Sequence, residues 1–235
     1  MLKVKSLRET VRVYLFFTRP MLDWREVHSR FFRMIHEGFG SKLRVQVSEF
    51  SGFPAAVTMG DLRARWTIYG GASSVTLFAD RIEFDFPVLL PSDYPLAWDI
   101  LRTVHDLLPR TFDDWQYDRI ESQTYEHLEI PASVGVSRYL EAYRRPEVDA
   151  AFAGTDAVSQ PAIKFKLTSR DESWDCEVVA EKSLFSAAAI FVVRNLAMTK
   201  VDPMAPFSDK VMRAQNVAQR CLAALGLEYD SAVSS

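Results

Sequence analysis

Alternating hydrophobic and polar positions predict β-strands over much of the chain. Residues 10–17 place Val11, Val13 and Leu15 on one strand face. From 43 to 86, short runs alternate apolar with polar or charged residues and are separated by turns such as Gly70-Gly71. Short alternating strands with turns between them are typical of an antiparallel meander that has one buried face and one polar face.

A hydrophobic period of 3.6 residues predicts helices in four other places. The expected helices cover 24–37, 96–108, 136–143 and about 208–225. Pro109 is expected to end the second helix, because proline lacks the backbone N–H that continues a helix. Ser208 or Asp209 is expected to cap the last one.

Two segments leave alternatives open. Residues 115–130 are extended but weakly patterned, which predicts either a long strand with a bulge or an edge strand. Residues 184–199 are long enough for a helix, but the β-branched run AIFVVRNLAMT favours a strand.

The order of these elements predicts an α+β fold, in which antiparallel meanders carry amphipathic helices on one face. Strands followed by a proline-marked break and a helix occur twice, so two related halves are a hypothesis. The linker candidate is 146–161, PEVDAAFAGTDAVSQP. It would divide an N-terminal α+β half, 1–145, from the C-terminal strands and long helix, 162–230, which are expected to pack together. Whether it separates two domains stays open.

Three stretches carry a family resemblance. The run VTLFADRIEFDF at 75–86, the helix with Trp98 and Leu101, and YDRIES at 117–122 resemble a widespread family of uncharacterised bacterial proteins. Members have a similar length, an α+β layout, and a final strand followed by a long helix, as 190–225 would form here. The resemblance implies a fold and no activity.

Composition and charge narrow the classes of function. The chain has 235 residues, is 48% hydrophobic and 25% charged, and carries a net charge of −3, which argues against binding nucleic acid through overall charge. The first 45 residues nevertheless hold ten Lys/Arg against four Asp/Glu. This excess indicates either an anionic partner or pairing with acidic residues inside the fold.

The same sequence favours a cytoplasmic protein. The N-terminal residues lack the continuous apolar core of a signal peptide, and the longest apolar stretch, 184–193, is too short to span a membrane. Cys176 and Cys221 form no CxxC pair, so we expect buried, reduced and inert thiols.

Motifs for common chemistries are missing from the sequence. No histidine or cysteine spacing suits a metal, and neither a G-x-S-x-G elbow nor a phosphate-binding loop occurs. We therefore expect no catalytic residue, no metal and no cofactor. Whether the protein is an enzyme stays open, and a non-enzyme is favoured.

Two groups of residues are candidate sites. One could contact anions or nucleic acid through a basic and aromatic sheet face; it comprises Lys42, Arg44, Arg63, Arg65 and Tyr69. The other is the carboxylate pair Glu83 and Asp85, which share a strand face and could serve a pocket as acid and base. Pairing between these basic and acidic residues is the simpler interpretation.

Three hypotheses on function follow. The favoured one is a non-enzymatic binding or adaptor subunit of a bacterial protein complex, which holds a partner, or a second copy, through a sheet edge or a helix groove. The second is a nucleic-acid-associated protein that uses the basic N-terminal region. The third is a small-molecule-binding protein or enzyme with a pocket between sheet and helices, using Glu83, Asp85 or His105.

Overall fold

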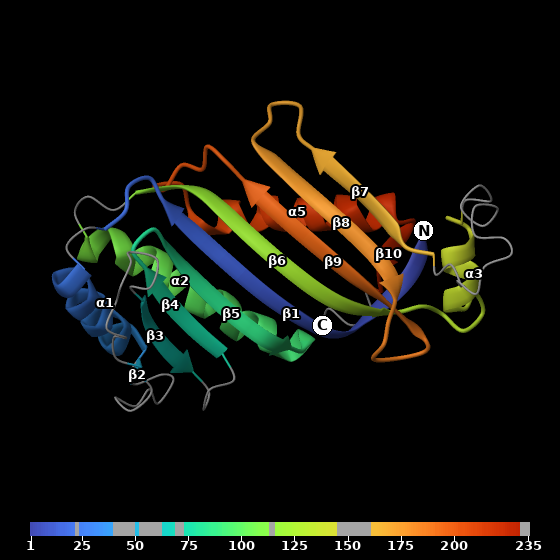
Figure 1. The fold of residues 1–235 in the computed structure, drawn as a ribbon, viewed down its shortest axis with the longest axis horizontal. Helices are drawn as coiled ribbons and strands as arrows, with labels where there is room; N and C mark the ends of the chain where they lie inside the picture. The colour runs from blue at the N-terminus through green and yellow to red at the C-terminus, as the bar shows by residue number, and fades with distance from the viewer. Residues whose placement is uncertain are drawn as a thin grey trace, which may run out of the picture.

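The computed structural model describes residues 1–21, 24–39, 50–51, 63–68, 73–112, 116–144 and 161–230. In these residues the protein has the predicted α+β fold. Nine strands form one antiparallel sheet in the order β2-β3-β4-β5-β1-β6-β9-β8-β7, and β10 pairs in parallel with the start of β1 (Figure 1).

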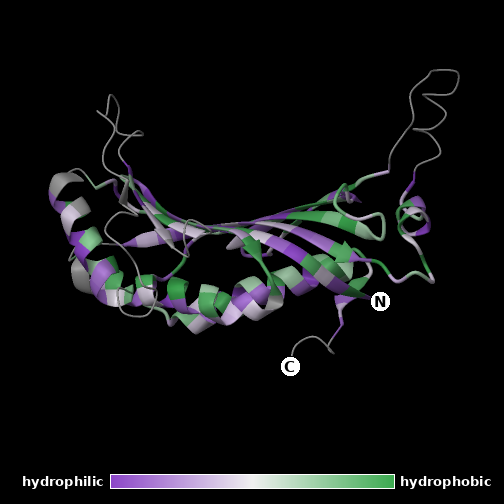
Figure 2. Ribbon diagram, turned by 90° about the horizontal axis from the view of Figure 1, so that it is seen from below, coloured by the Kyte–Doolittle hydropathy of each residue, from purple (hydrophilic) through white to green (hydrophobic). Residues whose placement is uncertain are grey.

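The strands are β1 (Leu2–Phe17), β2 (Phe50–Ser51), β3 (Arg63–Ile68), β4 (Ser73–Phe78), β5 (Arg81–Leu89), β6 (Tyr117–Glu129), β7 (Ile163–Thr168), β8 (Trp174–Lys182), β9 (Ala189–Met198) and β10 (Leu227–Tyr229). The helices are α1 (Trp24–Phe39), the 3₁₀ turn η3 (Pro91–Asp93), α2 (Tyr94–Thr111), α3 (Val136–Glu141) and α5 (Phe207–Ala224). Figure 2 shows α1, α2 and α5 on one side of the sheet, while no described helix covers the opposite side. We call these sides the helix face and the open face.

The strand pattern explains this layering. Ile82, Phe84 and Phe86 alternate along β5, are at most 2% exposed, and point to the helix face. Their register partners on β1 are Leu15, Val13 and Val11, as expected because directly opposed residues share a face. The helix face therefore carries the core, and the residues between these positions lie on the open face.

The chain repeats one arrangement twice. Strand, helix, three-stranded meander and helix occur as β1-α1-β3-β4-β5-α2 and again as β6-α3-β7-β8-β9-α5. Helices α2 and α5 have 18 residues each. The first residue of α5 lies 113 positions after the first residue of α2, and the last residues of the two helices are separated by the same number of positions. Outward from β1 the sheet continues with β5, β4 and β3, and outward from β6 it continues with β9, β8 and β7. A pseudo-twofold axis therefore passes between the central strands β1 and β6.

The two halves of the sequence are thus related, and they share one sheet. In the structure the second repeat begins at β6, so β6 and α3 belong with the C-terminal strands. The sequence pattern instead placed both elements in the N-terminal half, 1–145. Residues 145–160 lie outside the described residues, so the linker at 146–161 stays a prediction.

Several element boundaries differ from the sequence prediction. Strand β1 begins at Leu2 rather than at Thr10, because its first residues pair with β6 and β10. Strand β6 lies at the centre of the sheet and is not an edge strand, and its pairing with β1 contains register shifts. Helix α2 continues past Pro109 to Thr111. The preference for a strand within 184–199 is confirmed by β9.

Helix α5 begins one residue earlier than expected. Its N-cap is Pro206, so neither Ser208 nor Asp209 caps it.

Helix α1 packs closely against α2. A Cβ added to Gly38 would stand 2.7 Å from Leu107 Cδ1, so a larger residue would require the Leu107 side chain to move.

Candidate functional site

A groove of about 620 Å³ lies between α2 and α5, at the junction of the two halves. Helix α2 contributes Pro95, Trp98, Asp99 and Arg102, and α5 contributes Phe207, Ser208, Val211, Met212 and Gln215. Apart from Phe207, these residues form four pairs that lie 113 positions apart, as α2 and α5 themselves do. The groove is therefore formed by equivalent positions of the two repeats and lies on the pseudo-twofold axis.

The groove has apolar walls and a neutral rim. The rings of Trp98 and Phe207 meet edge to face, with their centroids 6.4 Å apart. Met212 is 54% exposed and lines the groove, so its apolar side chain is accessible to another molecule. On the α2 side, Arg102 and Asp99 form an ion pair, with 2.5 Å between Arg102 Nη2 and Asp99 Oδ1. The groove can thus accept apolar side chains of another molecule.

A polar triad beside the groove ties α5 to α2. His105 Nδ1 lies 2.9 Å from Asp106 Oδ1, and His105 Nε2 lies 2.8 Å from Lys210 Nζ. Because an ammonium group only donates, His105 Nε2 accepts and Nδ1–H donates to Asp106. Lys210 also donates to the Pro203 carbonyl at 3.0 Å. Burial lowers the pKa of Lys210 to about 8 and also lowers the pKa of His105.

These contacts give the triad a positioning role. His105 and Lys210 are each 7% exposed, and neither lines the groove. The His105 ring also lies against Phe207, with a centroid distance of 5.3 Å. The triad therefore holds the first turn of α5 against the middle of α2, and so sets the spacing of the groove walls.

A buried charge cluster lies on the helix face of the central strands. Arg194 Nη2 lies 2.7 Å from Glu126 Oε2 and 3.4 Å from Glu9 Oε1. The Tyr229 hydroxyl donates to Glu126 at 2.8 Å, and the Tyr94 hydroxyl donates to Glu9. Desolvation, aided by the charge of Glu126, raises the pKa of Glu9 to about 7. Because Tyr94 is the first residue of α2, the cluster anchors one wall of the groove to the sheet.

Sequence reasoning allowed for a helix groove but assigned no residue to it, and it missed this cluster. The predicted strand at 10–17 excluded Glu9, and the weak pattern of 115–130 did not identify Glu126 as a buried residue. One signal was present: Glu126 and Leu128 alternate on one face of β6, and Leu128 is fully buried. That alternation places the Glu126 carboxylate inside the protein.

The structure describes two of the five predicted anion-contact residues. Arg63 and Arg65 lie exposed on the open face of β3, where their register partners on β4 are Phe78 and Thr76. Lys42, Arg44 and Tyr69 lie outside the described residues. The basic and aromatic face is therefore described only in part.

Glu83 and Asp85 also lie on the open face, because Ile82, Phe84 and Phe86 take the helix face of β5. This placement differs from the sequence hypothesis of a pocket between sheet and helices, since that pocket would need carboxylates on the opposite face. The Asp85 carboxylate accepts a hydrogen bond from Arg12 Nε at 3.0 Å. The cation that pairs with Asp85 is therefore Arg12, which is not one of the basic residues that the sequence analysis expected to pair with it.

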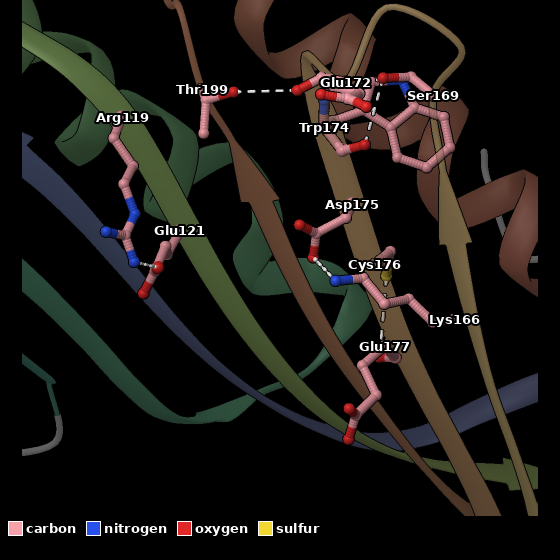
Figure 3. Close-up of polar contacts among 10 residues, drawn as sticks. All are labelled: Arg119, Glu121, Lys166, Ser169, Glu172, Trp174, Asp175, Cys176, Glu177 and Thr199. Atoms are coloured by element: carbon pink, nitrogen blue, oxygen red, sulfur yellow. Dashed lines mark hydrogen bonds and ion pairs between the residues drawn. The ribbon is translucent and has the colours of Figure 1, made fainter.

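Further ion pairs cross or follow the strands of the open face (Figure 3). Arg119 pairs with Glu121 along β6, and Lys166 Nζ on β7 lies 3.4 Å from Asp175 Oδ1 on β8. Lys164 and Glu177 form a similar pair at 3.0 Å. These pairs balance much of the charge on this face.

No protein-family model matches the chain, and no curated protein is significantly similar to it. The described ranges contain no group of three or more His, Cys, Asp or Glu side chains that could hold a metal ion. None of the helices in those ranges combines the length and hydrophobicity needed to cross a membrane.

Proposed function

We propose that the protein is a non-enzymatic binding or adaptor subunit of a bacterial protein complex in the cytoplasm, and that the groove between α2 and α5 holds its partner. The observation that carries this proposal is an apolar groove with Trp98, Phe207 and the exposed Met212 at the junction of two related halves. Tryptophan and methionine are enriched at protein interfaces relative to the rest of a protein surface.

The shape of the groove favours a helical or short extended segment as the partner. Two neighbouring helices with apolar residues between them form the surface that receives an amphipathic helix in helix-in-groove recognition. The thioether of Met212 is flexible and polarisable, so it can adapt to aliphatic or aromatic anchors. We therefore propose an apolar protein segment as the ligand.

The chemistry of the lining supports a protein partner over the two other hypotheses. Arg102 is paired with Asp99, so the groove does not offer the excess of cations that binds phosphates. The lining includes Ser208, but it contains no histidine that could activate this hydroxyl as a nucleophile, and no cysteine that could itself be one. These features suit recognition more than phosphate binding or acyl transfer.

The test is affinity purification of tagged protein from its native host at low salt, with and without nuclease. Three forms are compared: the unchanged chain, Met212→Glu in the groove, and the control Leu184→Glu, at a fully exposed residue between β8 and β9. We expect to recover one protein partner, in the same amount with and without nuclease and with the unchanged chain and the control. The amount recovered with Met212→Glu should fall about tenfold or more, because placing a charge in an apolar contact is costly.

Two outcomes of the purification count against the proposal. Equal recovery by both variants would place the partner elsewhere on the surface. Partners that are lost with nuclease would favour the nucleic-acid hypothesis. Circular dichroism spectra and thermal midpoints of the two variants establish that both are folded before the comparison is made.

A further inference from the structure

The two cysteines of the chain meet in the core. Cys176 lies on the helix face of β8, and Cys221 lies in the last turns of α5, 45 positions further along. Their Sγ atoms are 3.5 Å apart, and the residues are 1% and 0% exposed. Local periodicity did not predict this contact, because each cysteine was expected only to face the core.

Their surroundings make the two thiols unequal. The hydrogen bond with Cys176, helped by the charge of Arg194, lowers the pKa of Cys221 below its ordinary value. The same hydrogen bond, together with burial, raises the pKa of Cys176. Two adjacent thiols of unequal acidity, with their sulfur atoms 3.5 Å apart, are the arrangement of an attacking and a resolving cysteine.

We propose that Cys176 and Cys221 are a redox modification site, which closes to an intramolecular disulfide when a hydroperoxide oxidises the protein. The inference goes beyond the groove and does not depend on it. It replaces the expectation of two inert thiols with a reversible cross-link between β8 and α5.

The oxidation proceeds in two steps with hydrogen peroxide as the oxidant. The Cys221 thiolate attacks one peroxide oxygen, the O–O bond breaks, and Cys221 becomes a sulfenic acid while the released hydroxide takes a proton to form water. The sulfur of Cys176, which gives up its proton, then attacks the Cys221 sulfur. An S–S bond forms, the S–O bond breaks, and the second oxygen leaves as water. Two thiols and one peroxide thus give one disulfide and two water molecules.

The small movement that closure requires supports the site. Disulfide formation brings the sulfur atoms from 3.5 Å to about 2 Å, and both elements are already packed together. Cross-linking residues 45 positions apart restricts the unfolded chain. We expect the oxidised protein to unfold at a midpoint higher by roughly 5–15 °C.

In the experiment, the purified full chain is treated with hydrogen peroxide. Reduced glutathione is present in the same tube, and its oxidation serves as the internal standard. The reaction is quenched, the protein is unfolded, free thiols are alkylated with N-ethylmaleimide, and intact mass is measured. We expect both cysteines to lose alkylation together, with the loss of two hydrogens and no added oxygen, and dithiothreitol to restore both thiols and the original midpoint.

Two single variants identify the roles of the cysteines. In Cys176→Ser the remaining Cys221 should form a sulfenic acid that dimedone traps, whereas in Cys221→Ser the remaining Cys176 should react more slowly. The proposal is overturned if both thiols stay alkylatable when the glutathione is fully oxidised, or if each cysteine gains oxygen separately. It is equally overturned if the disulfide forms only in protein unfolded with urea.

Discussion

Replacing Glu9 with glutamine should make the protein more stable at alkaline pH. Glu9 is 7% exposed, and burial beside Glu126 raises its pKa from 4.5 to about 7. Between these pH values the folded protein holds a proton that the unfolded chain has lost, so the free energy of unfolding falls as the pH rises. A shift of this size corresponds to roughly 3 kcal/mol of lost stability above pH 7.

The variant Glu9→Gln removes this titration and keeps one oxygen, which can accept from either Tyr94 or Arg194. Urea unfolding at several pH values should give equal stabilities for both proteins near about pH 4, below the unfolded pKa of Glu9, and a variant more stable by about 3 kcal/mol near pH 8. Taking the difference between the two proteins isolates Glu9 from His105, whose lowered pKa makes stability rise with pH instead.

The matched control is Glu181→Gln, at an exposed strand residue. It should change the free energy of unfolding by less than about 0.5 kcal/mol at every pH, as most surface substitutions do. If Glu9→Gln were less stable than the unchanged protein at high pH, or if the difference did not vary with pH, the account of the buried cluster would be wrong.

Three further substitutions test the packing by urea unfolding. Arg194→Met should cost about 3–5 kcal/mol near pH 8, because it leaves the fully buried carboxylate of Glu126 without a cation; a change below about 1 kcal/mol would show that the ion pair is not buried in solution. Phe84→Ala should cost about 3–5 kcal/mol through a cavity between sheet and helices, and a near-neutral result would contradict its placement in the core. Gly226→Ala should cost about 1 kcal/mol, because Gly226 has a φ of +70° while a Cβ would meet only ordinary contacts; no loss would indicate a different backbone conformation.

Local periodicity predicted the elements well, because each strand or helix buries one face. The alternation around Phe84 placed Glu83 and Asp85 on the polar face of β5, where the structure has them. The partner of Asp85 could not be predicted, since strand order decides it. Arg12 reaches Asp85 only because β1, far away in sequence, pairs with β5.

The groove between the two repeats could not be predicted from local periodicity either. Trp98 and Val211 occupy equivalent places in the groove, as do Pro95 and Ser208, yet their side chains differ in size and polarity. Backbone geometry is retained while side chains diverge, so an alignment of residue types could not reveal the equivalence. The groove and the contact between the two cysteines are products of tertiary packing, and helical periodicity alone does not specify which buried faces meet.

The central claim, a protein partner in the groove, is tested most directly by photocrosslinking in the native host. A photoreactive benzoylphenylalanine is placed at Met212, with Leu184 as the matched exposed control position. The account predicts a defined crosslinked protein adduct from position 212 that position 184 does not give and that persists after nuclease treatment. No adduct at 212, or the same adducts from both positions, would contradict it.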